Sequence, residues 1–209
     1  NTFTGNTHSS FTGASHFIYT RGVAGSLFST VNINSNVVAN HTHSLNSNGA
    51  FYGLFHSGVA TSTTGNLSMN ANTFTNTTLV GGTGAMYLIS STCPSTNSIS
   101  ILSNTLSQIT NSTSSTGLFY VIHNTANVLA GSLDISTNVF TNLNSSASTG
   151  NRYLLYNGGG ISNTLTMNGN VVSNCNHHAS GNASYFMINN NSAFSGSLSS
   201  INSNSFKSV

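Results

Sequence analysis

Charged side chains are almost absent from this chain of 209 residues. Three Lys or Arg residues and a single acidic residue make up 2% of it, whereas an ordinary soluble domain has about 25%. The clustered Lys and Arg that bind nucleic acid are therefore missing. Near-zero charge also removes the repulsion that keeps proteins apart in solution. We expect no nucleic-acid partner and a molecule that packs into an assembly.

Carboxylates and long apolar runs are scarce as well, and this excludes several classes of protein. Asp134 is the one carboxylate side chain, whereas glycoside hydrolysis normally needs a pair and calcium needs several acidic oxygens. Because Asp134 lies between Leu133 and Ile135, we interpret it as a surface residue of a strand. Apolar runs fall well short of the roughly 20 residues of a membrane-spanning helix. The sequence predicts no enzyme, no cofactor and no membrane span.

What the chain does contain is a repeat, found by aligning each Asn that is followed two residues later by an apolar side chain. The anchors of the repeat are Asn1, Asn36, Asn72, Asn104, Asn138, Asn170 and Asn204, spaced 32 to 36 residues apart. Two residues after the anchors stand Phe3, Val38, Phe74, Leu106, Phe140, Val172 and Phe206. Three residues before them stand Ile33, Met69, Ile101, Ile135, Met167 and Ile201. Five residues before them stand Val31, Leu67, Ile99, Leu133 and Leu165, with a slip of one to Leu198 in the last copy. Fifteen residues after them stand Phe51, Tyr87, Phe119, Tyr153 and Tyr185, a column that we expect to lie in the core.

Apolar residues two apart predict three short strands in each copy, such as 133–135, 138–140 and 118–122. Copies differ in length mainly between the aromatic column and the next first strand, which indicates a coil with one variable corner. The predicted fold is all-β, a right-handed parallel β-helix of about six coils of about 34 residues. Residues 1–209 form a single β-solenoid segment, which we expect to be a fragment of a longer repetitive chain.

The anchors predict a structural ladder made of Asn36, Asn72, Asn104, Asn138, Asn170 and Asn204. Asn tolerates left-handed backbone angles at a bend. Identical Asn side chains stacked at strand spacing can also bond to one another along the stack. Further Asn residues stand two before the anchors (34, 70, 168 and 202) or four after them (40, 76, 142 and 174), and we interpret these as structural too.

Short apolar strands alternating with Asn, Gly and Ser/Thr bends resemble the right-handed β-helices of autotransporter passengers and bacterial surface adhesins. Phe3-Thr4-Gly5-Asn6 is similar to the Phe-x-x-Asn element of chlamydial polymorphic outer-membrane proteins, although the companion Gly-Gly-Ala-Ile element is absent. The resemblance implies a β-helix on the cell surface or outside the cell.

Histidine and cysteine could carry chemistry of their own. His8, His43 and His177 fall seven residues after their anchors, with His41 and His178 beside two of them. Neighbouring copies permit a zinc or copper site, but the interpretation we prefer is exposed polar loop residues. Cys93 and Cys175 lie three copies apart, beyond the roughly 7 Å that a disulfide spans between Cα atoms. We predict two free thiols.

Asn-x-Ser/Thr sequences could accept glycans if the chain passes through a glycosylating secretory route. They begin at Asn40, Asn66, Asn76, Asn111, Asn144, Asn182 and Asn190.

Repetition, missing charge and open coil ends favour a non-catalytic structural protein of the cell surface or extracellular space: an adhesin shaft, a stalk or a filament subunit. Unpaired strand edges would favour self-association, end to end or lateral, or continuation of the same chain. The corner loops 57–66 and 189–196 would be the surfaces that recognise glycans or a host.

Two other functions remain open. One is a carbohydrate-binding or phage-fibre-like module that uses Tyr, Asn and His along a groove; an exposed aromatic row would favour it, but most Tyr fall in the expected core column. The other is ice binding by an uncharged Thr array. Thr73, Thr75, Thr105, Thr137 and Thr141 do not form a clean two-column ladder, so ice binding ranks last.

Overall fold

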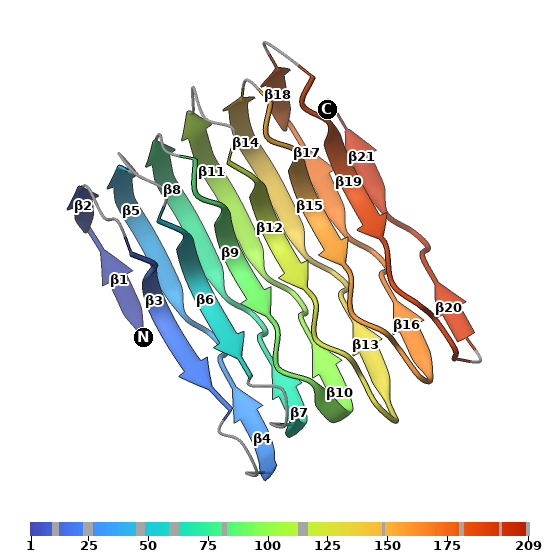
Figure 1. Cartoon of the computed structure of the whole chain (residues 1–209). Helices are drawn as coiled ribbons and strands as arrows, with labels where there is room; N and C mark the ends of the chain where they lie inside the picture. The colour runs from blue at the N-terminus through green and yellow to red at the C-terminus, as the bar shows by residue number, and fades with distance from the viewer. Residues whose placement is uncertain are drawn as a thin grey trace.

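The computed structural model describes residues 1–9, 13–22, 27–44, 49–58, 63–80, 83–112, 117–147, 149–179, 182–196 and 198–207. These residues form strands and no helix, and the strands lie in three parallel sheets of a β-solenoid (Figure 1). The solenoid has about five turns with a spacing of about 34 residues. The predicted all-β parallel β-helix is confirmed.

Each turn contributes one segment to each sheet. Sheet A follows the anchors and contains, in order, β1 (Thr2–Thr4), β5 (Val37–Ser44), β8 (Thr73–Val80), β11 (Thr105–Ser112), β14 (Val139–Ala147), β17 (Val171–Ser173) and β21 (Ser205–Lys207). At its edges β2 (Thr7–Ser9) pairs with β5 and β18 (Asn176–Ala179) pairs with β14. Sheet B contains β3 (Ser15–Arg21), β6 (Phe51–Ser57), β9 (Met86–Ser91), β12 (Phe119–Asn124), β15 (Arg152–Asn157) and β19 (Tyr185–Asn190). Sheet C contains β4 (Leu27–Asn32), β7 (Thr63–Ser68), β10 (Ser95–Ser100), β13 (Ser132–Asp134), β16 (Thr164–Thr166) and β20 (Leu198–Ser200).

The core fills the space between the three sheets and is built from the inward-facing side chains of their strands. Sheet C places Leu67, Ile99, Leu133 and Leu165 in the interior, all at most 1% exposed. The apolar columns three before and two after the anchors are buried from Ile33 to Val172, as predicted, whereas Ile201 and Phe206 in the last turn are 44% and 42% exposed. The last turn departs from the expected slip, because β16 and β20 pair Leu165 with Ser199. Leu198 therefore faces outward and is 58% exposed.

In the middle of the sheet A strands, a residue with left-handed backbone angles breaks the regular alternation of inward and outward side chains. Asn40, Asn76, Gln108, Asn142 and Asn174 all have positive φ, between 48° and 54°. The first inward side chain beyond this residue lies three positions after the previous inward side chain, and the next one follows two positions later. The resulting interior triplets are Val38, His41 and His43; Phe74, Thr77 and Leu79; and Leu106, Ile109 and Asn111. Asn four after the anchor is thus structural, as expected, because Asn tolerates this conformation.

The bend from sheet C into sheet A uses a second left-handed residue, which is not the anchor itself. Ser35, Ala71, Ser103, Thr137 and Ser203 have φ between 54° and 58°, and Gly169 has φ 63°. Each stands one residue before an anchor. The expectation that the anchor Asn adopts this conformation is therefore wrong, and the anchors are required for their side chains instead.

Candidate functional site

The anchor Asn side chains form a continuous hydrogen-bonded ladder inside the bend. The Nδ2 of each anchor donates to the Oδ1 of the anchor in the next turn, from Asn1 to Asn204, over 2.9–3.1 Å. The same Oδ1 accepts the backbone N–H of the preceding anchor from Asn36 onward. Each Nδ2 from Asn72 onward also donates to a backbone carbonyl of the previous turn, such as Ile33 or Met69. Asn36, Asn72, Asn104, Asn138 and Asn170 are at most 3% exposed. The predicted ladder residues thus lie together, and all their polar atoms serve the stack.

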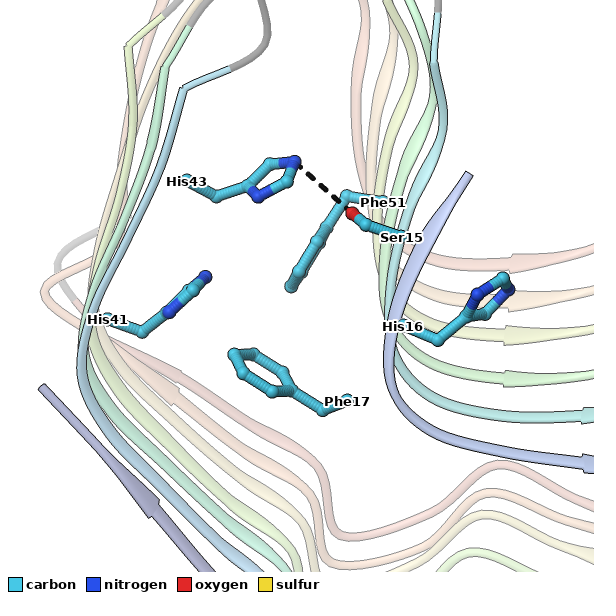
Figure 2. Close-up of a pocket in the computed structure, with 6 residues that line it drawn as sticks. All are labelled: Ser15, His16, Phe17, His41, His43 and Phe51. Atoms are coloured by element: carbon cyan, nitrogen blue, oxygen red, sulfur yellow. Dashed lines mark hydrogen bonds between the residues drawn. The ribbon is translucent and has the colours of Figure 1, made fainter. Parts of the chain in front are cut away.

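Histidines that the sequence suggested would be exposed lie inside the first complete turn. His41 and His43, on β5, are 1% and 0% exposed. Figure 2 shows both rings pointing inward beside Phe17 and Phe51, whereas His16 points away on the outer side of β3. The His43 Nε2 lies 3.4 Å from Ser15 Oγ. The expectation of polar loop residues is wrong here, because the left-handed Asn40 turns both side chains inward.

The space beside these rings is too small for most ligands. The cavity lined by Ser15, His41, His43 and Phe51 has a volume of about 10 Å³, which is no more than a single water needs. β2 and β5 pair His8 with His43, as the repeat predicts, although the side chains of His8 and His178 lie outside the described ones. His177 stacks on Tyr185 at 5.3 Å between ring centroids. The described residues bring no three His, Cys, Asp or Glu side chains together as a metal site.

Sheet B presents a row of stacked aromatic rings on its outer face. Running from β3 to β19, the rings belong to His16, Tyr52, Tyr87, Tyr120, Tyr153 and Phe186, which pair in register. Neighbouring centroids are 4.7–5.0 Å apart and the planes differ by 4–8°. A second column three residues further along the strands adds Tyr19, Phe55, His123 and Tyr156. We call these two columns the aromatic stripe.

The expected core column of aromatics mixed two faces of this sheet. Phe51 and Phe119 do lie in the core, at 2% and 3% exposure. Tyr87 and Tyr153 do not, because the register pairs Phe51 with Met86 and Phe119 with Arg152. Counting from the anchors missed this, since the loops into sheet B differ by one residue and a shift of one reverses the face.

The core position between Phe119 and Tyr185 is taken by a buried cation. Arg152 is 1% exposed, and burial lowers the pKa of its guanidinium to about 10. The guanidinium donates to Ser145 Oγ at 2.8 Å and to the carbonyls of Gly117 and Gly150 at 2.5 and 3.1 Å. A planar fork with several donors is suited to such a set of acceptors. We interpret Arg152 as a cross-brace between two loops.

The corner between sheets B and C carries a shallow hollow. It has a volume of about 470 Å³ and is lined by side chains that include Asn127, Leu129 and Ser162 and by Gly158 and Gly160. Leu129 is 50% exposed. The corners stack as well, since Val128 pairs with Ser95 and Ile161. Of the two loops predicted for recognition, 189–196 contributes Ala193 and Ser195 to this hollow, whereas residues 59–62 of the loop 57–66 lie outside the described residues. The side chains that line the hollow are uncharged.

The Thr residues considered for ice binding do not share one flat surface. Thr73, Thr75, Thr105 and Thr141 lie at outward positions of sheet A, whereas Thr137 belongs to the bend. Ser107 Oγ donates to Thr75 Oγ1 at 3.2 Å. The left-handed Asn and Gln residues interrupt the array with exposed amides.

Glycan acceptor sequences differ in accessibility. The side chains of Asn40, Asn76, Asn144, Asn182 and Asn190 are exposed and that of Asn66 is half-buried. Asn111 is 2% exposed, so its amide could not carry a glycan in the folded chain. Cys93 and Cys175 are both buried free thiols. Asp134, half-buried on sheet C, accepts a hydrogen bond from Ser136 Oγ.

No protein-family model, curated protein or solved structure matches this chain. None of the described residues forms a helix long and apolar enough to cross a membrane.

Proposed function

We propose that this chain is a non-catalytic structural segment, the shaft of a surface adhesin, stalk or filament in the extracellular space. The observation that carries the proposal is the uninterrupted Asn ladder from Asn1 to Asn204, whose hydrogen bonds join every turn to the next and are buried from Asn36 to Asn170. A buried donor or acceptor left without its hydrogen-bond partner costs about 1–3 kcal/mol. A stack with several such bonds at every step therefore resists local opening, as a shaft requires.

The way in which the strands stack supports the same role. Stacked strands bond along the solenoid axis, so the structure can lengthen by adding turns without changing its cross-section. Two sets of buried polar groups serve the stack: the anchors hold the bend, and Arg152 braces two loops. A rod of this kind separates whatever lies at its two ends by a fixed distance.

Labelling of native source material tests this proposal. Antibodies raised against the folded chain would be followed by immunogold electron microscopy of intact cells and shed material. We expect gold at regular positions along surface shafts or fibres. Gold on discrete globular particles, or confined to the cell interior, would overturn the structural role.

Carbohydrate binding is a second candidate, favoured by the corner hollow. Its half-exposed Leu129 beside the amide of Asn127 gives the mixture of apolar and hydrogen-bonding groups that sugars require. A glycan array probed with the chain should then give hits that Asn127→Ala weakens. Thr166→Ala, on sheet C, is the matched control. An array without hits would remove this candidate.

A further inference from the structure

The aromatic stripe on sheet B is an unusual surface for a chain that is otherwise covered with Asn, Ser and Thr. Its first column crosses six strands and its rings are spaced 4.7–5.0 Å apart. Cross-contacts join the two columns, as between Tyr120 and His123 at 4.6 Å and between Tyr52 and Phe55 at 4.3 Å. The stripe carries no Lys, Arg, Asp or Glu. The two arginines on sheet B lie elsewhere, Arg21 at the end of β3 and Arg152 inside the core.

The rings of the stripe are stacked on one another, and this limits what can bind. Neighbouring planes differ by at most 8° along the first column. The ring faces are therefore largely covered by the next ring. A sugar that stacks on an aromatic face would find such faces only at the two ends of the column. The outward surface offers ring edges and phenol hydroxyls, least at Tyr120 in the middle of the column, which is 7% exposed.

The hydroxyls of Tyr52, Tyr87 and Tyr120 stay neutral near pH 7. Burial raises the pKa of Tyr52, and burial together with neighbouring tyrosines raises those of Tyr87 and Tyr120. A neutral phenol both donates and accepts a hydrogen bond. A row of such groups is complementary to an identical row, and bringing two rows together does not oppose like charges.

From this geometry we infer that the aromatic stripe binds the aromatic stripe of a second copy of the chain, with sheet B facing sheet B. A stacked solenoid repeats along its axis at strand spacing, about 4.8 Å. Another copy of the same chain has this period automatically, so every ring of the first column meets a ring of the first column in the other copy. Facing sheets with equal periods can interdigitate their side chains into a dry interface. The inference rests on the proposed structural role and deepens it by naming the surface through which shafts would associate laterally.

The area of the face is adequate for a weak, reversible dimer. Six strands at about 4.8 Å and six residues at about 3.3 Å give a face of about 600 Å² on each copy. Two such faces bury about 1,200 Å², just above the roughly 1,000 Å² expected of a biological interface. The interface would be isologous, with a two-fold axis near Tyr87 and Tyr120 at the middle of the stripe.

Sedimentation equilibrium of the purified chain over a wide concentration series tests the inference. We expect a monomer–dimer equilibrium. Tyr87→Lys brings like charges together near the two-fold axis, and Tyr156→Lys buries a charge among the rings of the other copy, so each should raise the dimer Kd by at least about tenfold. Thr75→Lys on sheet A and Thr166→Lys on sheet C add the same charge to other outward faces and should leave the Kd unchanged. Circular dichroism and thermal unfolding would select variants that keep the fold.

A second measurement does not depend on introducing charge. Tyr87→Cys places a thiol near the expected two-fold axis. Facing sheets pack about 10 Å apart, which is farther than a disulfide reaches, so a bismaleimide that bridges about 10 Å should link two copies, whereas Thr75→Cys should not be linked. The inference is overturned if the chain remains monomeric throughout, or if all four Lys variants weaken the dimer equally. It is also overturned if a linear polysaccharide binds the monomer and Tyr87→Lys abolishes that binding. None of these results bears on the immunogold experiment, so the two proposals can fail separately.

Discussion

Removing one anchor side chain in the middle of the ladder should destabilise the solenoid strongly. Asn104 is 0% exposed and its side chain makes four hydrogen bonds. Its Oδ1 accepts from the backbone N–H and the Nδ2 of Asn72, at 2.8 and 3.0 Å. Its Nδ2 donates to Asn138 Oδ1 at 2.9 Å and to the Met69 carbonyl at 3.0 Å. Asn104→Ala deletes all four and leaves two donors of Asn72 buried without these acceptors.

The magnitude follows from the number of bonds. At about 1 kcal/mol net for each hydrogen bond, Asn104→Ala should lower the free energy of unfolding by about 4 kcal/mol. Asn97→Ala, at an exposed position of β10, should change it by no more than about 0.5 kcal/mol. Asn204→Ala should fall between them, because this anchor is half-buried and Asn170 is its only ladder neighbour among the described residues.

Urea denaturation followed by circular dichroism measures these differences, with the transition slope compared between variants to check that the denatured state is unchanged. Asn104→Asp sharpens the test, since a carboxylate of nearly the same shape can accept from Asn72 but cannot donate to Asn138. At neutral pH it should be at least as destabilising as Ala, and the loss should shrink when acid protonates the carboxyl group. The reasoning is refuted if Asn104→Ala costs less than about 1 kcal/mol or no more than Asn97→Ala.

Three further predictions concern buried groups. Burial lowers the pKa of His56 and of His123 to about 4. As pH falls below 6.5, the unfolded chain therefore binds protons before the folded chain does, and stability should drop by roughly 2 kcal/mol for each His between pH 7 and pH 4 and level off below pH 4. His56→Gln and His123→Gln together should flatten the dependence of the urea midpoint on pH. Gly131→Ala would place a Cβ 1.3 Å from the Asn97 carbonyl oxygen, so we expect a loss of about 3 kcal/mol or more, whereas Gly13→Ala, with no atom within 4 Å, should be neutral in the same titration. Arg152→Lys should cost about 2–3 kcal/mol because an ammonium cannot bond Ser145 and two carbonyls together; exposed Arg21→Lys is its control, and equal midpoints would contradict the cross-brace.

The ladder and the coil could be predicted because the signals that specify them recur at a constant phase. Each anchor Asn stands two residues before an inward apolar side chain, so the alignment placed the polar stack and the core together. The stacked Asn side chains were predicted correctly. The bend was not, since its left-handed residue varies among Ser, Ala, Thr and Gly and leaves no column in the sequence.

The aromatic stripe and the buried histidines required the structure. The loop between an anchor and sheet B differs by one residue from copy to copy. Tyr52 and Tyr87 therefore share a column in the sheet, although they lie at different distances from their anchors in the sequence. His41 and His43 are polar and would be assigned to the surface by composition alone. Their burial follows from the left-handed Asn40, which shifts the inward positions of the strand by one. A pattern of interior spacings of three and then two, as in Phe74, Thr77 and Leu79, is the sequence signal that would have revealed it.

Fibre diffraction from aligned native material that contains this chain tests the structural role most directly. If the chain forms a shaft, its strands run across the long axis and stack along it. The account then predicts a meridional reflection at about 4.8 Å, the spacing between neighbouring strands. Aligned fibres without that meridional reflection, or native material that yields only discrete particles, would contradict the account.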